Sequence, residues 1–261
     1  MKQFRLTHAL LVATVFALVP AASGDTLTYS DNFEASTLNS FWAVNQQLGT
    51  VSLSTNQNHT PSGSQSVEFA PSSTSGQHDM SLTHTFSTET QGDYTVWFYD
   101  SGEAYSDQTY YNFLALVDSA TGDIASVGNM DFDPSCYAAG LYTPSASFGP
   151  NASCGPYPQL TTTDTARTVG WHEFEIDDSA TSLIISIDGT QVLDVAGNYS
   201  FDSVTLHTFG PENSTTPTYW DDFNAVTTSA VPEPSSVVPL TIFLGSIILR
   251  RKTWGIGNPS R

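Results

Sequence analysis

The fold is decided most clearly by the stretch Ser182-Leu183-Ile184-Ile185-Ser186-Ile187-Asp188-Gly189-Thr190-Gln191-Val192-Leu193. Asp188-Gly189 separates two runs rich in β-branched residues. Such a pair favours a two-residue hairpin turn, because that turn needs positive φ, which Gly adopts without steric cost. Leu183, Ile185 and Ile187 alternate along the first run, so they share one face, which we expect to be the core face. The stretch therefore predicts an antiparallel β-hairpin.

Similar short runs recur on both sides of this hairpin. They are rich in Val, Ile, Thr, Tyr and Phe and end at Gly, Pro, Asn, Asp or Ser, as strands do, and no long segment has the 3.6-residue period of an amphipathic helix. We predict strands at 27–33, 50–54, 66–70, 80–86, 94–100, 110–117, 123–128, 169–176, 183–187, 191–195, 203–209 and 219–226. About a dozen short strands favour an all-β sandwich of two packed antiparallel sheets.

Charge is distributed unevenly along the 261 residues. Between Asp25 and Ser229 lie 25 of the 26 acidic residues but only one of the seven basic residues, Arg167, so this body carries a net charge of about −24. A surface of that charge repels phosphate groups, which excludes nucleic acid and anionic lipid as partners. Aromatic and β-branched residues are nevertheless plentiful, so we expect a folded domain over 25–229.

The first 24 residues have the pattern of a secretory signal peptide. Lys2 and Arg5 precede an apolar run at 9–19, and small residues follow at 20–24. The apolar run is shorter than the roughly 20 residues that a membrane-spanning helix needs. We therefore predict that residues 1–24 are cleaved and that the body is exported.

The segment 230–261 also reads as a targeting signal. It resembles the PEP-CTERM sorting signal of Gram-negative bacteria, in which a Pro-Glu-Pro motif, a hydrophobic helix and a basic tail follow in order. The matching residues are Pro232, Glu233 and Pro234, the apolar run 237–249, and Arg250, Arg251 and Lys252. The resemblance implies an exosortase-like processing enzyme at the inner membrane and delivery to the cell surface or extracellular matrix. The apolar helix is short, about 20 Å, and the alternative is a plain C-terminal transmembrane anchor.

The body is similar to concanavalin A-like (laminin G-like) jelly-roll domains. The matching pieces, in chain order, are Asp31-Asn32-Phe33-Glu34, residues 61–67, Gly170-Trp171-His172-Glu173-Phe174, Ile187-Asp188-Gly189 and Trp220-Asp221-Asp222-Phe223. The resemblance implies a lectin- or glucanase-type sandwich. It does not by itself imply sugar binding, because one fold hosts many functions.

The same resemblance implies a structural calcium ion. Many jelly-roll carbohydrate-binding modules join their first and last strands through calcium held by an acid after an early aromatic residue and an acid in a late Asp-Asp-aromatic motif. Glu34 matches the first position, and Asp221 or Asp222 matches the second. Carboxylate oxygens suit this ion. The alternative is that these acids only cap turns and strand ends.

One acidic pair bears on catalysis. Glu175-Ile176-Asp177 is similar to the Glu-x-Asp core of retaining laminarinases and lichenases, which need a nucleophile and an acid about 5 to 5.5 Å apart. The acid should come at or near the next alternate position, where Ser179 and Ala180 stand instead. The pattern favours solvated surface acids over a glucanase site, so we predict no catalytic residues.

The two cysteines, Cys136 and Cys154, lie in a Pro-, Gly- and Tyr-rich insertion at 131–158, which we expect to contain no strands. In an exported protein such an isolated pair predicts a disulfide.

Four aromatic residues are candidates for stacking on sugar rings: Trp97, Tyr99, Tyr137 and Tyr142. Tyr137 and Tyr142 belong to the insertion, and the alternative is that they cover the sandwich. Trp97 and Tyr99 alternate with Tyr94, Val96 and Phe98, and the pattern leaves open which of these two faces is the core.

The leading hypothesis is a non-enzymatic, exported surface or matrix protein, with polysaccharide as the ligand we expect if the domain binds one. The first alternative is a glycan-active enzyme of the same fold, such as a glucanase or lyase. The second is a purely structural acidic surface protein. An aromatic platform in a concave face would favour binding, a cleft with converging acids would favour the enzyme, and neither would favour the structural protein.

Overall fold

The computed structural model of the chain describes residues 25–72, 76–103, 111–130, 135–143, 146–148, 161–210 and 215–229. The predicted signal peptide and the predicted sorting motif, including Pro232, Glu233, Pro234, Arg250, Arg251 and Lys252, lie outside these ranges. Within the described ranges, no helix is long and apolar enough to cross a membrane.

The described chain is built of β-strands. In order they are β1 (Thr26–Asp31), β2 (Ala43–Gln47), β3 (Gly49–Ser54), β4 (Ser66–Pro71), β5 (His78–Asp100), β6 (Tyr111–Val117), β7 (Ile124–Met130), β8 (Cys136–Thr143), β9 (Ala146–Phe148), β10 (Thr161–Ala166), β11 (Gly170–Asp178), β12 (Ser182–Ile187), β13 (Thr190–Ala196), β14 (Phe201–Gly210) and β15 (Thr218–Ser229). Each strand pairing found in these ranges is antiparallel. The all-β antiparallel prediction is confirmed.

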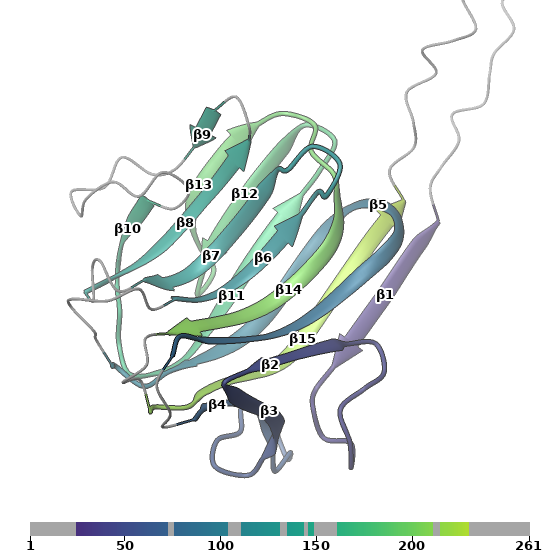
Figure 1. The fold of residues 1–261 in the computed structure, drawn as a ribbon. Helices are drawn as coiled ribbons and strands as arrows, with labels where there is room; N and C mark the ends of the chain where they lie inside the picture. Colours follow the sequence, from purple (N-terminus) through teal and green to yellow (C-terminus); the bar gives the residue numbers. More distant parts are fainter. Residues whose placement is uncertain are drawn as a thin grey trace, which may run out of the picture.

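The strands form two layers joined by the long strand β5 (Figure 1). The first layer runs β10-β8-β7-β6-β14 to the first half of β5, whose other edge pairs with β2. The second layer runs β13-β12-β11 to the second half of β5, then β15, which pairs with β1 and β4. At Gly92, between the halves, an added Cβ would collide with the Val226 backbone of β15.

One hydrophobic core lies between the layers. The predicted hairpin is confirmed as β12 and β13, with Asp188 at φ 50° and Gly189 at φ 70° in the turn. Leu183, Ile185 and Ile187 are fully buried, as expected.

The core also includes Tyr94, Val96 and Phe98 of β5. Trp97 and Tyr99 therefore point to the outer face of the second layer.

The strand prediction was wrong at several places. The predicted strands 80–86 and 94–100 are parts of the single strand β5. β2, β8, β9 and β10 were missed, and β8 and β9 lie in the insertion expected to lack strands. The sequence of β8, CYAAGLYT, has small residues of low strand propensity, and it becomes a strand because the edge of β7 pairs with it and its side chains are buried.

Candidate functional site

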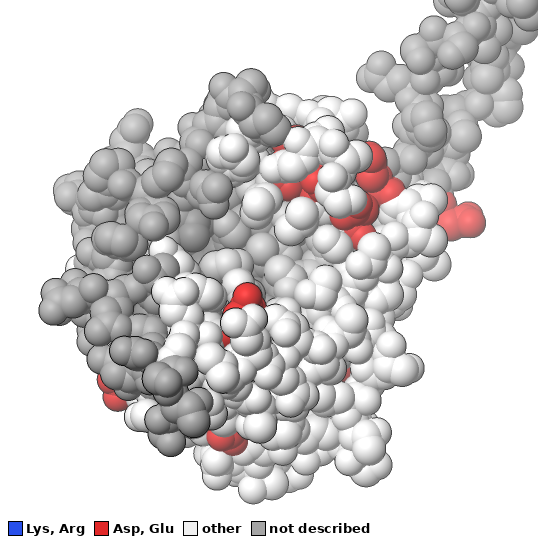
Figure 2. Space-filling model, viewed as in Figure 1, with Lys and Arg blue, Asp and Glu red and all other residues white. Residues whose placement is uncertain are grey.

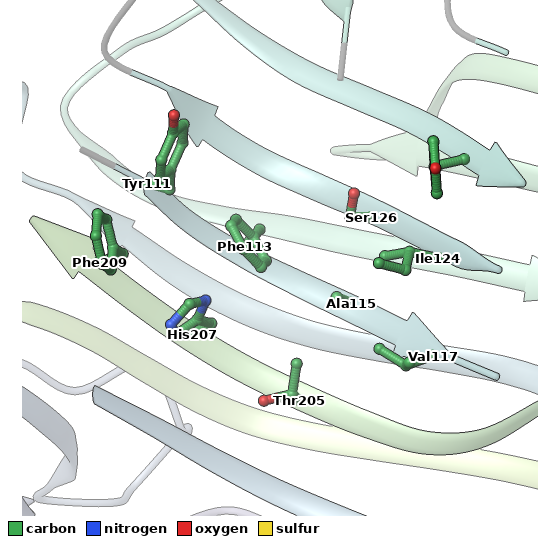
Figure 3. A pocket seen from close by; sticks show the side chains of 10 residues that line it. Tyr111, Phe113, Ala115, Val117, Ile124, Ser126, Thr205, His207 and Phe209 are labelled. Carbon is green, nitrogen blue, oxygen red and sulfur yellow. The ribbon is translucent and has the colours of Figure 1, made fainter. Parts of the chain in front are cut away.

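A pocket of about 460 Å³ opens on the outer face of the first layer (Figure 3). Its lining comes from four adjacent strands: Tyr111, Phe113, Ala115 and Val117 of β6, Ile124 and Ser126 of β7, Tyr142 of β8, and Thr205, His207 and Phe209 of β14. Alternate residues of β6 and β14 point away from the core, and the pairing of Tyr111 with Phe209 and of Phe113 with His207 brings these rings together. We call this feature the aromatic pocket.

The rings of the aromatic pocket are tilted or edge to face relative to one another rather than in one stack. The Phe113 and His207 ring centres are 5.0 Å apart at 76°. Tyr111 lies 6.3 Å from Phe113 and 6.1 Å from Phe209. Half-buried rings at such angles leave apolar faces against which a flat ligand can pack.

His207 is one of the polar residues of this lining, and Asp79 holds it from one side. The His207 Nε2 atom is 3.0 Å from Asp79 Oδ1. Asn45 Nδ2 donates to the same carboxylate oxygen at 3.1 Å and to the Asp79 carbonyl oxygen at 3.2 Å. This chain of contacts fixes the imidazole ring, so the pocket offers a positioned polar group among aromatic side chains.

The predicted sugar-stacking residues divide between three places. Tyr142 lines the aromatic pocket. Tyr137 does not face solvent: it is fully buried, and its hydroxyl donates to Asp100 Oδ2 at 3.1 Å. The side chain of Tyr137 therefore covers the end of the core, which is the alternative to sugar stacking given for it in the sequence analysis. Trp97 and Tyr99 lie on the outer face of the opposite layer.

Around Trp97 a second group of aromatic rings gathers. His59, from the loop between β3 and β4, stacks on Trp97 with ring centres 3.7 Å apart at 14°. Trp171 of β11 lies 5.6 Å from His59 and 5.4 Å from Tyr99. Neither His59 nor Trp171 was selected from the sequence, although Trp171 stood in a quoted motif.

The acids predicted to bind calcium hold this same loop, residues 55–65. Asp221 is buried and accepts hydrogen bonds from the backbone N–H groups of His59 and Thr60 at 2.8 and 3.1 Å. Asp222 Oδ1 accepts from the Thr60 hydroxyl at 2.7 Å, and its Oδ2 lies 2.8 Å from His59 Nδ1.

Glu34 holds the far end of the loop. It accepts from the N–H groups of Ser64 at 2.9 Å and Gln65 at 3.0 Å, and the Gln65 bond is the main reason that its pKa is lowered. The described part of the chain contains no group of three metal-binding side chains. Calcium binding by Glu34, Asp221 or Asp222 therefore stays a prediction.

The Glu-x-Asp pair lies on the opposite layer from the aromatic pocket. Glu175 and Asp177 project from the outer face of β11, next to Asp93 of β5, which pairs directly with Asp177. Burial, with further contributions from Glu175, Asp177 and Glu173, raises the pKa of Asp93 to about 6. The lining of the aromatic pocket, as far as the structure describes it, contains no carboxylate.

Cys136 begins β8, whereas Cys154 lies outside the described residues. The disulfide between them stays a prediction.

The architecture matches solved structures at low sequence identity. "Cellulose induced protein, Cip1" is 18% identical with a TM-score of 0.55, and the match covers 78% of this chain and 99% of that one. An endo-β-galactosidase from Clostridium perfringens is 10% identical with a TM-score of 0.52, covering 82% of this chain and 64% of that one. These likenesses define the body as a concanavalin A-like jelly roll. No family model and no curated protein matches the sequence.

Sequence reasoning missed the residues that make the aromatic pocket: Tyr111, Phe113, His207 and Phe209. The signal was present as alternation, since β6 carries rings at Tyr111 and Phe113 and β14 at His207 and Phe209, each pair two positions apart. It could not be used, because the chain does not reveal that these two strands, about 90 residues apart, are neighbours.

Proposed function

We propose that the protein is a non-enzymatic polysaccharide-binding protein of the cell surface or extracellular matrix, and that the aromatic pocket is its glycan site. The observation that carries this proposal is the convergence of Tyr111, Phe113 and Phe209 with the positioned His207 on one solvent-facing sheet. Sugar rings bind proteins by packing their apolar C–H faces on aromatic rings while a few placed polar groups bind their hydroxyls.

Binding rather than hydrolysis is favoured by where the acids lie. A glycosidase needs two carboxyl groups on either side of the bond that is broken. Asp79 contacts His207 beside the pocket, but Glu175 and Asp177 project from the other layer. We therefore expect the pocket to hold a glycan without cleaving it.

The test of the pocket is binding to a panel of soluble polysaccharides, including laminarin and xylan, with reducing-sugar release measured in parallel. Phe113→Ala should weaken binding about five- to tenfold, because losing one stacking ring costs about 1–1.5 kcal/mol. Tyr199→Ala is the matched control, since it removes a half-buried ring that does not line the aromatic pocket.

Two results would count against the proposal. Equal binding by the Phe113→Ala variant and the unmodified protein would show that the pocket is not the glycan site. Reducing-sugar release that depends on Glu175 or Asp177 would instead support the glycan-active enzyme.

The proposed location rests on the two ends of the sequence. If residues 1–24 are a signal peptide and 230–261 a sorting signal, protein isolated from the native host should lack residues 1–24 and the basic end of the tail, with cleavage near Pro234 by an exosortase-like enzyme. Intact-mass measurement tests this. A mass that includes Arg261 would favour the plain anchor.

A further inference from the structure

The opposite layer carries a corner of aromatic side chains around one carboxylate. Trp171 and Glu173 are alternate residues of β11 and point to the same outer face, and Glu173 pairs across the strands with Trp97. The His59 ring covers Trp97 and stands at 60° to the Trp171 ring. Glu173 is therefore flanked by Trp97 and Trp171, with His59 forming a wall. We call this group the Trp171 corner.

The corner is held in place before any ligand arrives. His59 is fixed through Nδ1 by Asp222, and its backbone N–H by the buried Asp221. Glu34 binds the other end of the same loop. A surface whose side chains are already positioned loses little conformational entropy on binding, which favours a binding role for the corner.

Acidic side chains continue along the outer face of β11 beyond the corner. Glu175 and Asp177 follow Glu173 at alternate positions of β11, and Asp93 lies beside Asp177. Burial, Glu175 and Asp188 raise the pKa of Glu173, and His59 opposes them. Arg167, the one Lys or Arg between Asp25 and Ser229, pairs with Asp100 rather than with these acids. On the face in Figure 2, acidic but no basic side chains are visible among the described residues.

An organic ammonium group fits this combination. It is attracted to the faces of Trp rings and to a carboxylate, more strongly where the site is partly desolvated. The acids beyond Glu173 repeat about every 6.7 Å along β11, the spacing of alternate strand residues, which favours a ligand with several ammonium groups in a row. We propose that the Trp171 corner binds an ammonium-bearing sugar of a polycationic amino-sugar chain, whose next ammonium groups lie along Glu175, Asp177 and Asp93.

This second site does not depend on the aromatic pocket. The test is titration of the full chain with a fully deacetylated glucosamine hexamer, with the N-acetylated hexamer as the uncharged probe. The deacetylated hexamer should bind about tenfold or more tightly than the acetylated one, and its affinity should fall with added salt.

Three variants locate the binding. Glu173→Gln and Trp171→Ala should each lower the affinity for the deacetylated hexamer about tenfold, because one removes the charge and the other the ring. Asp164→Asn, an exposed acid on β10 in the other layer, makes the same change in net charge and should alter it less than about twofold. Phe113→Ala should leave this affinity unchanged, so failure of the pocket and failure of the corner give different results.

The proposal is overturned by any of three outcomes. Equal affinities for the two hexamers would show that the protein does not recognise the ammonium group. Equal losses in Glu173→Gln and Asp164→Asn would show attraction to net charge alone. Polylysine is compared with the deacetylated hexamer in the same way. If polylysine binds as tightly and Trp171→Ala weakens neither ligand, the binding comes from charge alone.

Discussion

Replacing Arg167 by Met is expected to destabilise the protein by about 3–5 kcal/mol, because it leaves a buried carboxylate without its positively charged partner. The Arg167 and Asp100 side chains are 5% and 1% exposed. The guanidinium group donates from Nε to Asp100 Oδ2 at 2.8 Å and from Nη2 to Oδ1 at 2.7 Å. A two-pronged pair of this kind fixes both side chains. A loss of this size is a large part of the 5–15 kcal/mol that stabilises a typical domain.

Urea unfolding followed by tryptophan fluorescence measures this loss. The matched control is the double variant Arg167→Met with Asp100→Asn, which leaves no charge in the site and should recover much of the stability. The prediction fails if the unfolding free energy of Arg167→Met alone stays within about 1 kcal/mol of that of the unmodified protein. The pair would then be as accessible to water as a surface salt bridge.

The same site accounts for Tyr137. Its hydroxyl donates to the carboxylate that Arg167 binds, and burial, followed by the Asp100 charge, raises the pKa of Tyr137. The hydroxyl therefore stays protonated and acts as a structural donor. This role explains why a residue expected to stack on sugars is instead part of the core.

Replacing Asp178 by Asn is expected to stabilise the protein, increasingly so towards alkaline pH. Asp178 is 2% exposed, and neither of its carboxyl oxygens has a hydrogen-bond partner among the described residues. Burial, with a contribution from Asp177, raises its pKa to about 8. The folded state thus holds a proton that the unfolded chain releases near pH 3.9. Between these two values the folded state binds more protons, so stability falls as the pH rises.

Asn cannot ionise, so this loss is absent from the variant. The difference in unfolding free energy between Asp178→Asn and the unmodified protein should grow by on the order of 5 kcal/mol from pH 4 to pH 8. Thermal and urea unfolding across this range measure it, with the exposed Asp194→Asn as control. Parallel stability profiles for Asp178→Asn and the unmodified protein would mean that Asp178 reaches water.

Features fixed by local chemistry could be predicted from the sequence, and features fixed by pairing could not. The β12–β13 hairpin follows from Asp188-Gly189 and the alternation of Leu183, Ile185 and Ile187, which need no distant partner. By contrast, Trp97 and Tyr99 alternate with equally apolar residues, so only the completed sandwich decides which set is outside. The Arg167–Asp100 pair joins residues 67 positions apart, which no local pattern indicates.

The candidate sites show the same limit more strongly. Glu34, Asp221 and Asp222 were selected as acids near the two ends of the body, and they do meet around one loop. What the resemblance could not supply is that the backbone of that loop already donates to these acids. Their hydrogen bonds arise from residues 59, 60, 64 and 65, whose approach depends on the β3–β4 hairpin packing beside β15.

The continuity of β5 has a mechanical consequence. Asp79, which holds His207 at the pocket, and Trp97, on which His59 stacks, are residues of this one strand, at its two ends. It is hydrogen-bonded to β2 and β14 at one end and to β11 and β15 at the other. A force that pulls the two faces apart would therefore act on the backbone of β5 and, parallel to the strands, on the hydrogen bonds that join β5 to its neighbours. The apolar contact between the layers would not have to resist this force alone. Two polymers bound on opposite faces would be kept at a constant separation.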